Sequence, residues 1–133
     1  MTRSGYSNDY DDPFQLICWR GQVASATRGK RGQAFFRALV AALDAMPEKR
    51  LIAEELEENG EVCAFGALGR WRGLPVRDMN PHDHEDLSAQ FDIAQQLVAE
   101  VEYENDDAYG CHAETPEQRW QRMRDWAAEQ IKA

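Results

Sequence analysis

The longest apolar pattern in the chain is QAFFRALVAALDAM, at residues 33–46. Its large apolar side chains recur three and four residues apart, and alanines lie between them, which is typical of an α-helix buried on several sides. Pro47 ends the pattern, because proline cannot continue a helix. We therefore expect this helix to form the centre of the core. The large apolar positions are Phe35, Phe36, Leu39, Val40, Leu43 and Met46.

Four further helices are expected from amphipathic patterns and start signals. Asp12 before Pro13 is a typical N-cap followed by a proline in the first turn. The helix that follows should fold back against the central helix as an antiparallel hairpin. Thr115 and Gln118, on either side of Pro116, are the residues of a capping box. The four helices are predicted at residues 13–27, after the turn at 80–83 up to Phe91, at 93–103 and at 116–132.

The spacing of apolar residues assigns faces to two of these helices. In the first, Leu16, Ile17 and Val23 share the side that is expected to face the core. In the helix at 93–103, the apolar side chains are expected to point inward. The side chains expected to point outward or sideways from that helix are Glu100, Glu102 and Glu104.

A small β-hairpin is predicted between the central helix and the acidic part of the chain. Asn59-Gly60 lies between two short stretches with apolar residues, and it favours a two-residue turn because both residues tolerate positive φ. The alternative is a helix over residues 48–58 that ends at the same dipeptide, which the leucine, alanine and glutamate content supports. The glycine-rich stretch 66–73, GALGRWRG, is expected to turn away from the hairpin.

The predicted fold is mainly α (α+β), with about five helices and one small β-hairpin at roughly 51–65. Residues 1–12 are polar and lack periodicity, so we expect a mobile N-terminal tail. Residues 13–133 are expected to form a single globular domain. Three widely spaced cysteines and no signal-peptide pattern favour a reducing cytoplasm. No membrane segment is expected, because a span takes about 20 apolar residues.

The charge of the chain is unevenly distributed. Residues 1–50 carry eight Lys/Arg and five Asp/Glu, a net charge of +3. Residues 51–133 carry seven Lys/Arg and nineteen Asp/Glu, a net charge of −12, so that the total is −9. From Asp78 to Gln118 there are twelve acidic residues and no Lys or Arg. Such a field repels nucleic acid and attracts basic partners.

We therefore expect a protein that binds a basic protein partner through an acidic surface, as an inhibitor or as a mimic of nucleic acid. Carboxylates four residues apart on a helix stand about 5–6 Å apart, on the scale of neighbouring phosphates. The alternative is a nucleic-acid-binding or regulatory protein that uses the basic turns at 28–31 and 70–72, the second with a tryptophan between two arginines. The candidate partner-binding residues are Asp86, Asp92, Glu100, Glu102, Glu104, Asp106 and Asp107. The candidate nucleic-acid-binding residues are Arg28, Lys30, Arg31, Arg70 and Arg72.

Other kinds of chemistry have weaker support. His82 and His84, with Cys111-His112, are metal-ligand types without the paired spacing of zinc sites, so solvated histidines are expected. Residues 87–101 have roughly the spacing of a helix-turn-helix, yet the second helix offers glutamates where DNA recognition needs Lys or Arg. No motif of an activated nucleophile is present. We expect no enzyme activity, no cofactor and no metal.

Two long stretches of the chain are WRGQVASATRGKRGQAFFRALVAALDAMPEKRLIAEELEENGEVCAFGALGR and, further on, YEND followed by ETPEQRWQRMRDW. In these stretches the chain resembles a group of small uncharacterised proteins encoded in the genomes of tailed phages and prophages. The resemblance covers most of residues 1–130 and carries no activity and no functional residue. It implies a setting in the cytoplasm of a bacterial host, where the partner is a basic host or phage protein.

Overall fold

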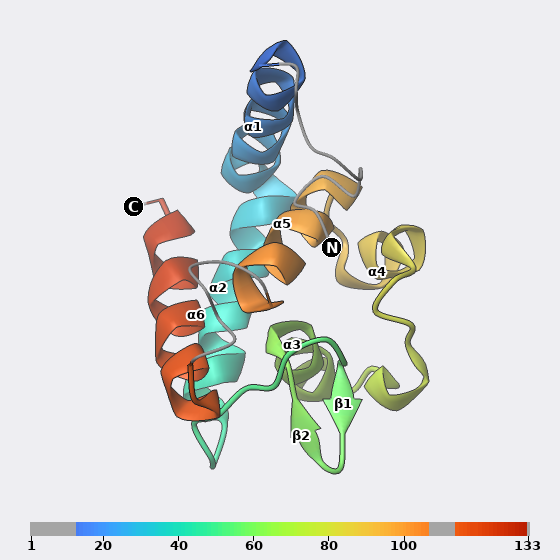
Figure 1. The fold of residues 1–133 in the computed structure, drawn as a ribbon, viewed down its shortest axis with the longest axis vertical. Helices are drawn as coiled ribbons and strands as arrows, with labels where there is room; N and C mark the ends of the chain where they lie inside the picture. The colour runs from blue at the N-terminus through green and yellow to red at the C-terminus, as the bar shows by residue number, and fades with distance from the viewer. Residues whose placement is uncertain (1–12, 107–113, 133) are drawn as a thin grey trace.

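The computed structural model describes residues 13–106 and 114–132 of the chain. Within these ranges the protein is mainly helical, with one small antiparallel hairpin, which confirms the predicted fold class (Figure 1). There is one α-helix more than predicted. The elements are α1 Pro13–Arg28, α2 Lys30–Ala45, β1 Glu57–Glu58, β2 Glu61–Val62, α3 Ala64–Arg72, η1 Val76–Asp78 (a 3₁₀ turn), α4 His84–Phe91, α5 Gln95–Asp106 and α6 Pro116–Gln130.

Helix α2 is the centre of the core, as predicted. Phe35, Phe36, Leu39 and Leu43 are almost fully buried, and α2 makes its most extensive contacts with α6 and α3. The helix ends just before Pro47. In the described part of the chain, no helix is both long and apolar enough to cross a membrane.

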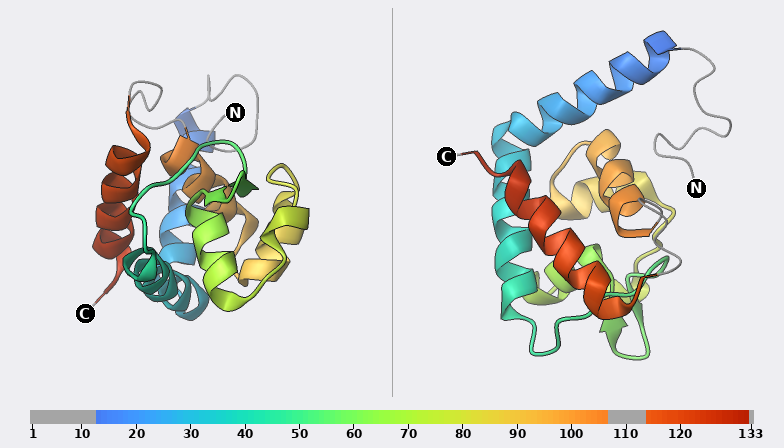
Figure 2. Two further views of the ribbon diagram at one scale, coloured as in Figure 1. Left: turned by 90° about the horizontal axis from the view of Figure 1, so that it is seen from below. Right: turned by 60° about the vertical axis from the view of Figure 1, so that its left-hand side comes forward.

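The predicted antiparallel hairpin of α1 and α2 is wrong. Only Gly29 separates the two helices. The last turn of α1 meets the first turn of α2 at a wide angle, and α1 does not lie alongside α2 (Figure 2). A side chain at Gly32 would clash with the carbonyl oxygen of Ala26, so this glycine permits the tight corner. The predicted inner face of α1 is also partly wrong, because Ile17 is 67% exposed while Trp19 is buried.

The β-hairpin forms around Asn59-Gly60, as predicted, and the alternative helix at 48–58 is not observed. Its strands are only two residues long, with Glu57 opposite Val62. Asn59 has φ 53° and Gly60 has φ 83°, the two positive angles that a two-residue turn of this kind requires.

Residues 66–73 are not a turn, because most of them belong to helix α3. The glycines that suggested a loop instead let the helix pack closely: a side chain at Gly66 would clash with the carbonyl oxygen of Leu56. Phe65 and Leu68 are buried against α2 and its neighbours. The helix ends at Gly73, whose φ of 79° is the usual left-handed ending.

Helices α4 and α5 are both present, as predicted, and α4 ends at Asp92, whose φ of 55° is left-handed. Helix α5 continues to Asp106, three residues beyond the predicted end at Tyr103. The capping box of α6 is present: Thr115 Oγ1 accepts the N–H of Gln118 at 3.1 Å, and Gln118 Oε1 accepts the N–H of Thr115 at 2.9 Å.

Candidate functional site

The glutamates of α5 are buried, and the prediction that they point outward or sideways is wrong. Glu100 and Glu102 are each 7% exposed, and Glu104 is 4% exposed. The physical reason is that α5 contacts α1, α4 and α6, so that its sides are covered as well as its apolar face. Carboxylates in such positions must be paired or hydrogen-bonded, because burial of an unpaired charge is costly.

Glu102 forms an ion pair with His84 at the start of α4. The hydrogen bond to Glu102 raises the pKa of His84, although partial burial of the imidazole acts in the opposite direction. Burial raises the pKa of Glu102, and the bond to His84 only partly offsets this. The pair therefore joins α4 to α5 and is a structural element as well as a titratable one.

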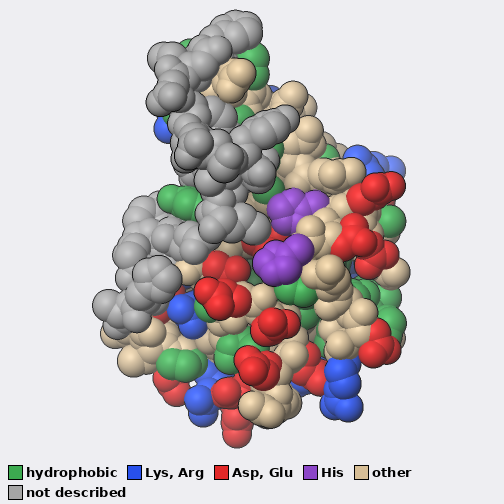
Figure 3. Space-filling model, turned by 45° about the vertical axis from the view of Figure 1, so that its right-hand side comes forward, with side chains coloured by type: hydrophobic (Ala, Val, Ile, Leu, Met, Phe, Trp, Pro, Cys, Tyr) green, Lys and Arg blue, Asp and Glu red, His purple; other side chains and the backbone are tan. Residues whose placement is uncertain are grey.

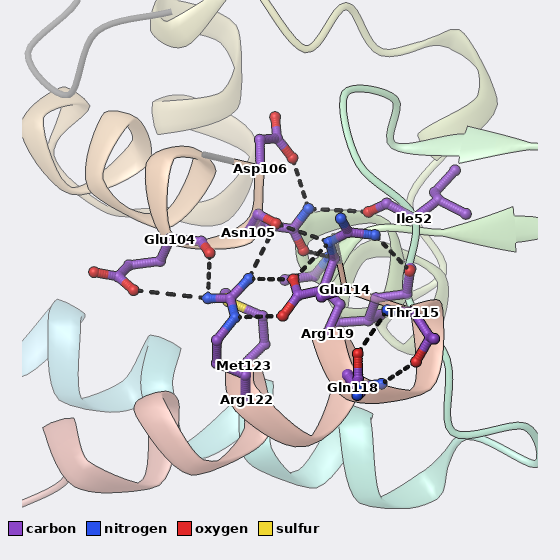
Figure 4. Close-up of polar contacts among 12 residues, drawn as sticks. Ile52, Glu104, Asn105, Asp106, Glu114, Thr115, Gln118, Arg119, Arg122 and Met123 are labelled. Carbon is purple, nitrogen blue, oxygen red and sulfur yellow. Dashed lines mark hydrogen bonds and ion pairs between the residues drawn. The ribbon is translucent and has the colours of Figure 1, made fainter. Parts of the chain in front are cut away.

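Glu104 belongs to a polar network between the ends of α5 and α6 (Figure 4). Arg122 of α6 binds both carboxylate oxygens of Glu114, at 2.7 and 2.9 Å. The same guanidinium donates to the backbone oxygen of Glu104 at 2.5 Å, and it lies 3.9 Å from the Glu104 carboxylate. The carboxylates of Glu104 in α5 and of Glu114 in the following segment thus help to hold α6 in place.

Asn105 and Arg119 complete this network. The Asn105 amide donates to the Ile52 carbonyl at 2.9 Å, and its oxygen accepts the N–H of Ala64 at 3.2 Å. Arg119 donates to the carbonyls of Asn105 and Leu51, at 3.0 and 3.3 Å. The carbonyls at the end of α5 are therefore capped by arginines of α6 (Figure 4), as the helix dipole favours.

The remaining predicted acidic residues lie apart from one another. Asp92 is exposed and pairs with Arg31 at 3.3 Å. Asp86 is half-buried, and its N–H donates to the carboxylate of Asp83. Asp106 is half-buried and accepts the N–H of Glu54 at 3.1 Å. Asp107 lies outside the described residues.

A different set of carboxylates gathers at the surface, and we call it the acidic surface. It consists of Glu54, Glu55 and Asp106, of which the first two are exposed. Glu54, Glu55 and Asp106 line a small depression of about 10 Å³, together with Leu56, Cys63 and Glu102, and its described lining contains no Lys or Arg. Figure 3 shows acidic side chains around the histidines on this face.

Glu54 and Glu55 were missed by the sequence analysis, because they precede the long segment without Lys or Arg. The signal available was the glutamate-rich stretch before Asn59-Gly60. Glu54 has φ 74°, a conformation that glycine adopts more easily. Its N–H bond to Asp106 helps to hold this conformation and brings the chain before β1 next to the end of α5.

The predicted basic residues lie in two places. Arg28, Lys30 and Arg31 are exposed at the junction of α1 and α2, where Arg31 pairs with Asp92. Arg70 and Arg72 belong to the last turn of α3 and not to a free turn. The first is held by Glu57 at 2.6 Å, with Trp71, 51% exposed, between the two arginines.

Among the described residues, no group of three or more His, Cys, Asp or Glu side chains is placed to hold a metal ion. Cys63 is buried, and burial raises the pKa of its thiol to about 12, so it is neutral and a poor nucleophile at physiological pH. Cys111 and His112 lie outside the described residues.

Comparison of the chain with protein-family models, with curated proteins and with solved structures finds no match.

Proposed function

We propose that this protein acts without catalysis, by binding a positively charged protein partner through the acidic surface. The observation that supports this most directly is the depression between Glu54, Glu55 and Asp106. Carboxylates from separate parts of the chain meet there, and no Lys or Arg of the described chain lines it. Glu54 and Glu55 differ in this from Asp44, Glu57 and Glu114, which are held by arginines.

The net charge of −9 supports the same proposal. A strongly acidic protein attracts a cationic partner from a distance, and local carboxylates then set the orientation of docking. Glu102 also lines the depression, but it is 7% exposed and pairs with His84, so the buried glutamates of α5 are excluded from the proposed contact. The acidic surface is thus smaller than the sequence suggested, and it lies partly on a different segment.

The resemblance to phage and prophage proteins supports a basic host or phage protein as the partner, in the cytoplasm of a bacterial host. A partner that normally binds nucleic acid is one form of this proposal, because the acidic surface would then occupy a site made for phosphates.

The proposal is tested with two charge-reversal variants of equal net charge. One variant changes Glu54 and Glu55 to Lys; the control changes Asp125 and Glu129, which are exposed on α6, to Lys. Each substitution adds two charge units, so both proteins change from −9 to −5. Binding of polylysine is followed by calorimetry at low and moderate salt.

We expect the Glu54/Glu55 variant to bind polylysine much more weakly than the control and with a smaller salt dependence, because charge at the contact itself is lost. Equal weakening in both variants would show that only net charge matters, which contradicts a defined surface. A preference of the unmodified protein for DNA over polylysine would favour the nucleic-acid alternative instead.

A further inference from the structure

Most basic side chains in the described chain already have partners. Arg31, Arg50, Arg70, Arg77 and Arg124 each pair with a carboxylate. Others cap backbone carbonyls, as Arg119 and Arg122 do at the end of α5. Within the described ranges, the basic side chains that make neither an ion pair nor a hydrogen bond are Arg20, Arg28, Lys30, Arg72 and Lys132.

Three of these five side chains line one groove. Arg20 and Arg28 come from α1 and Lys132 follows α6, and the groove has a volume of about 450 Å³. Figure 2 shows the C-terminal end of α6 beside the corner where α1 meets α2, so that α1 overhangs this end of the molecule. The wide angle at this corner, which was not expected from the sequence, is what opens the groove.

The groove has the size and chemistry of a site for a small molecule. Its volume lies within the range of typical ligand sites, roughly 300–1,000 Å³. Val23 and Ala24 provide an apolar wall, and Glu100 and Glu129 lie on the opposite side, on α5 and α6. Arginine guanidinium groups bind phosphate oxygens in pairs, while carboxylates accept hydrogen bonds from hydroxyl or amine groups.

We propose that this groove binds a small phosphate ester that also carries hydroxyl or amine groups. Arg20, Arg28 and Lys132 hold the phosphate, and Glu129 accepts a hydrogen bond from the rest of the ligand. The site is separate from the acidic surface and does not depend on its proposed function. A ligand of this kind also explains why unpaired cations, which are uncommon in a strongly acidic protein, gather in this groove.

The test compares two variants that each remove one unpaired arginine. Arg28→Gln removes a cation of the groove, and Arg72→Gln removes one at the end of α3, outside it. Both leave a net charge of −10, since each takes one positive charge from −9. Binding of inorganic pyrophosphate, adenosine 5′-monophosphate and a short oligothymidylate is measured by calorimetry and by amide shifts of Val23 and Ala24.

We expect Arg28→Gln to weaken binding by about tenfold, the scale of one hydrogen bond to a charged group. Arg72→Gln should change it less than about twofold, because salt screens distant exposed charges. Tighter binding of the monophosphate would identify a small ligand, and tighter binding of the oligonucleotide would identify a phosphate polymer at the same site. Absence of binding of all three probes at millimolar concentration, or equal effects of both variants, would overturn the proposal.

Discussion

Helices α2 and α5 both lie inside the molecule, but they are buried by different means. The contact side of α2 is formed mainly by phenylalanine, leucine and alanine, which are held by close packing, and the buried polar side chain of Gln33 near its start is hydrogen-bonded. Helix α5 buries Leu97, Val98 and Val101 together with three glutamates. Those glutamates need partners, such as His84 for Glu102 and Arg122 for Glu104.

The difference shows why a run of acidic residues is a poor guide to an acidic surface. The segment from Asp78 to Gln118 contains no Lys or Arg, but the cations that pair with it follow directly in α6 or lie in α2. Charge balance is therefore set by packing between distant segments. Among the exposed carboxylates, Asp44 and Asp92 pair with arginines, whereas Glu54 and Glu55 pair with no arginine of the described chain.

The largest expected effect comes from reversing the buried charges of α5. Changing Glu100, Glu102 and Glu104 together to Lys places three new cations in closed positions, removes the ion-pair partner of His84 and sets a cation beside Arg122. Breaking even one buried pair costs about 3–5 kcal/mol, against a typical total stability of about 5–15 kcal/mol. We expect circular dichroism to show an unfolded chain at room temperature.

The matched control for this experiment is the Glu54/Glu55→Lys variant, whose changes are exposed. It should remain folded, with a change in the free energy of unfolding within about 0.5 kcal/mol per site. If the α5 variant were as stable as this control, the α5 glutamates would be no more important for folding than the exposed Glu54 and Glu55.

The second largest effect is expected for a substitution on the buried side of α2. Leu39 is fully buried, and Leu39→Ala should lower the free energy of unfolding by about 2–5 kcal/mol because it leaves a cavity. Arg37→Ala, on the exposed side of the same helix, should lower it by much less. A loss below about 1 kcal/mol for Leu39→Ala in a denaturant titration would remove α2 from the centre of the core.

A smaller effect is expected at the start of α6, which carries the arginines that pair with the α5 segment. Thr115→Ala removes the N-cap and half of the capping box and should cost about 1 kcal/mol. Thr115→Ser keeps the hydroxyl and should retain most of the stability. Equal losses for both substitutions, measured by urea unfolding, would show that the cap hydrogen bond is unimportant.

The pH dependence of stability tests the pair of Glu102 and His84. The pKa of His84 is raised in the folded state, so its stabilising contribution is complete below the unfolded value of about 6.5 and is lost as the pH rises through the folded pKa. We therefore expect the free energy of unfolding to fall as the pH rises from 6 towards 8. Glu102, whose pKa is also raised, causes a similar fall that begins lower, above about 4.5.

His84→Gln should flatten the dependence between pH 6 and 8, whereas His82→Gln, at an exposed position, should leave it nearly unchanged. Proton titration of both histidines by NMR provides the independent check. A pKa of His84 at or below the ordinary value would contradict the pairing.

The sequence predicted those elements that depend on local signals. The apolar period of α2, the Asn59-Gly60 turn and the capping residues of α6 each act within a few residues, and each is found in the structure. Helix α3 was missed because Gly66 and Gly69 disfavour a helix locally. Tertiary contacts override this preference, since these glycines let the chain near Leu56 and Val76 approach the helix.

The candidate site was less predictable than the fold. The approach of Glu54 to Asp106 depends on a hydrogen bond between segments 52 residues apart. The groove beside Arg20 and Lys132 depends on the corner at Gly29, whose angle no local pattern specifies. Burial of the α5 glutamates depends on which helices cover the sides of α5. All three features arise from packing, so that a single sequence gives no local signal for them.

The most direct test of the central claim is carboxylate labelling of the native protein with a carbodiimide and a small amine, followed by mass spectrometry. Glu54 and Glu55 should be modified rapidly, whereas Glu100, Glu102 and Glu104 should be protected until denaturant unfolds the chain. The denatured protein, in which all five should react at similar rates, is the control. Native labelling of the α5 glutamates as fast as that of Glu54 and Glu55 would contradict the division of carboxylates into a structural set and a binding set.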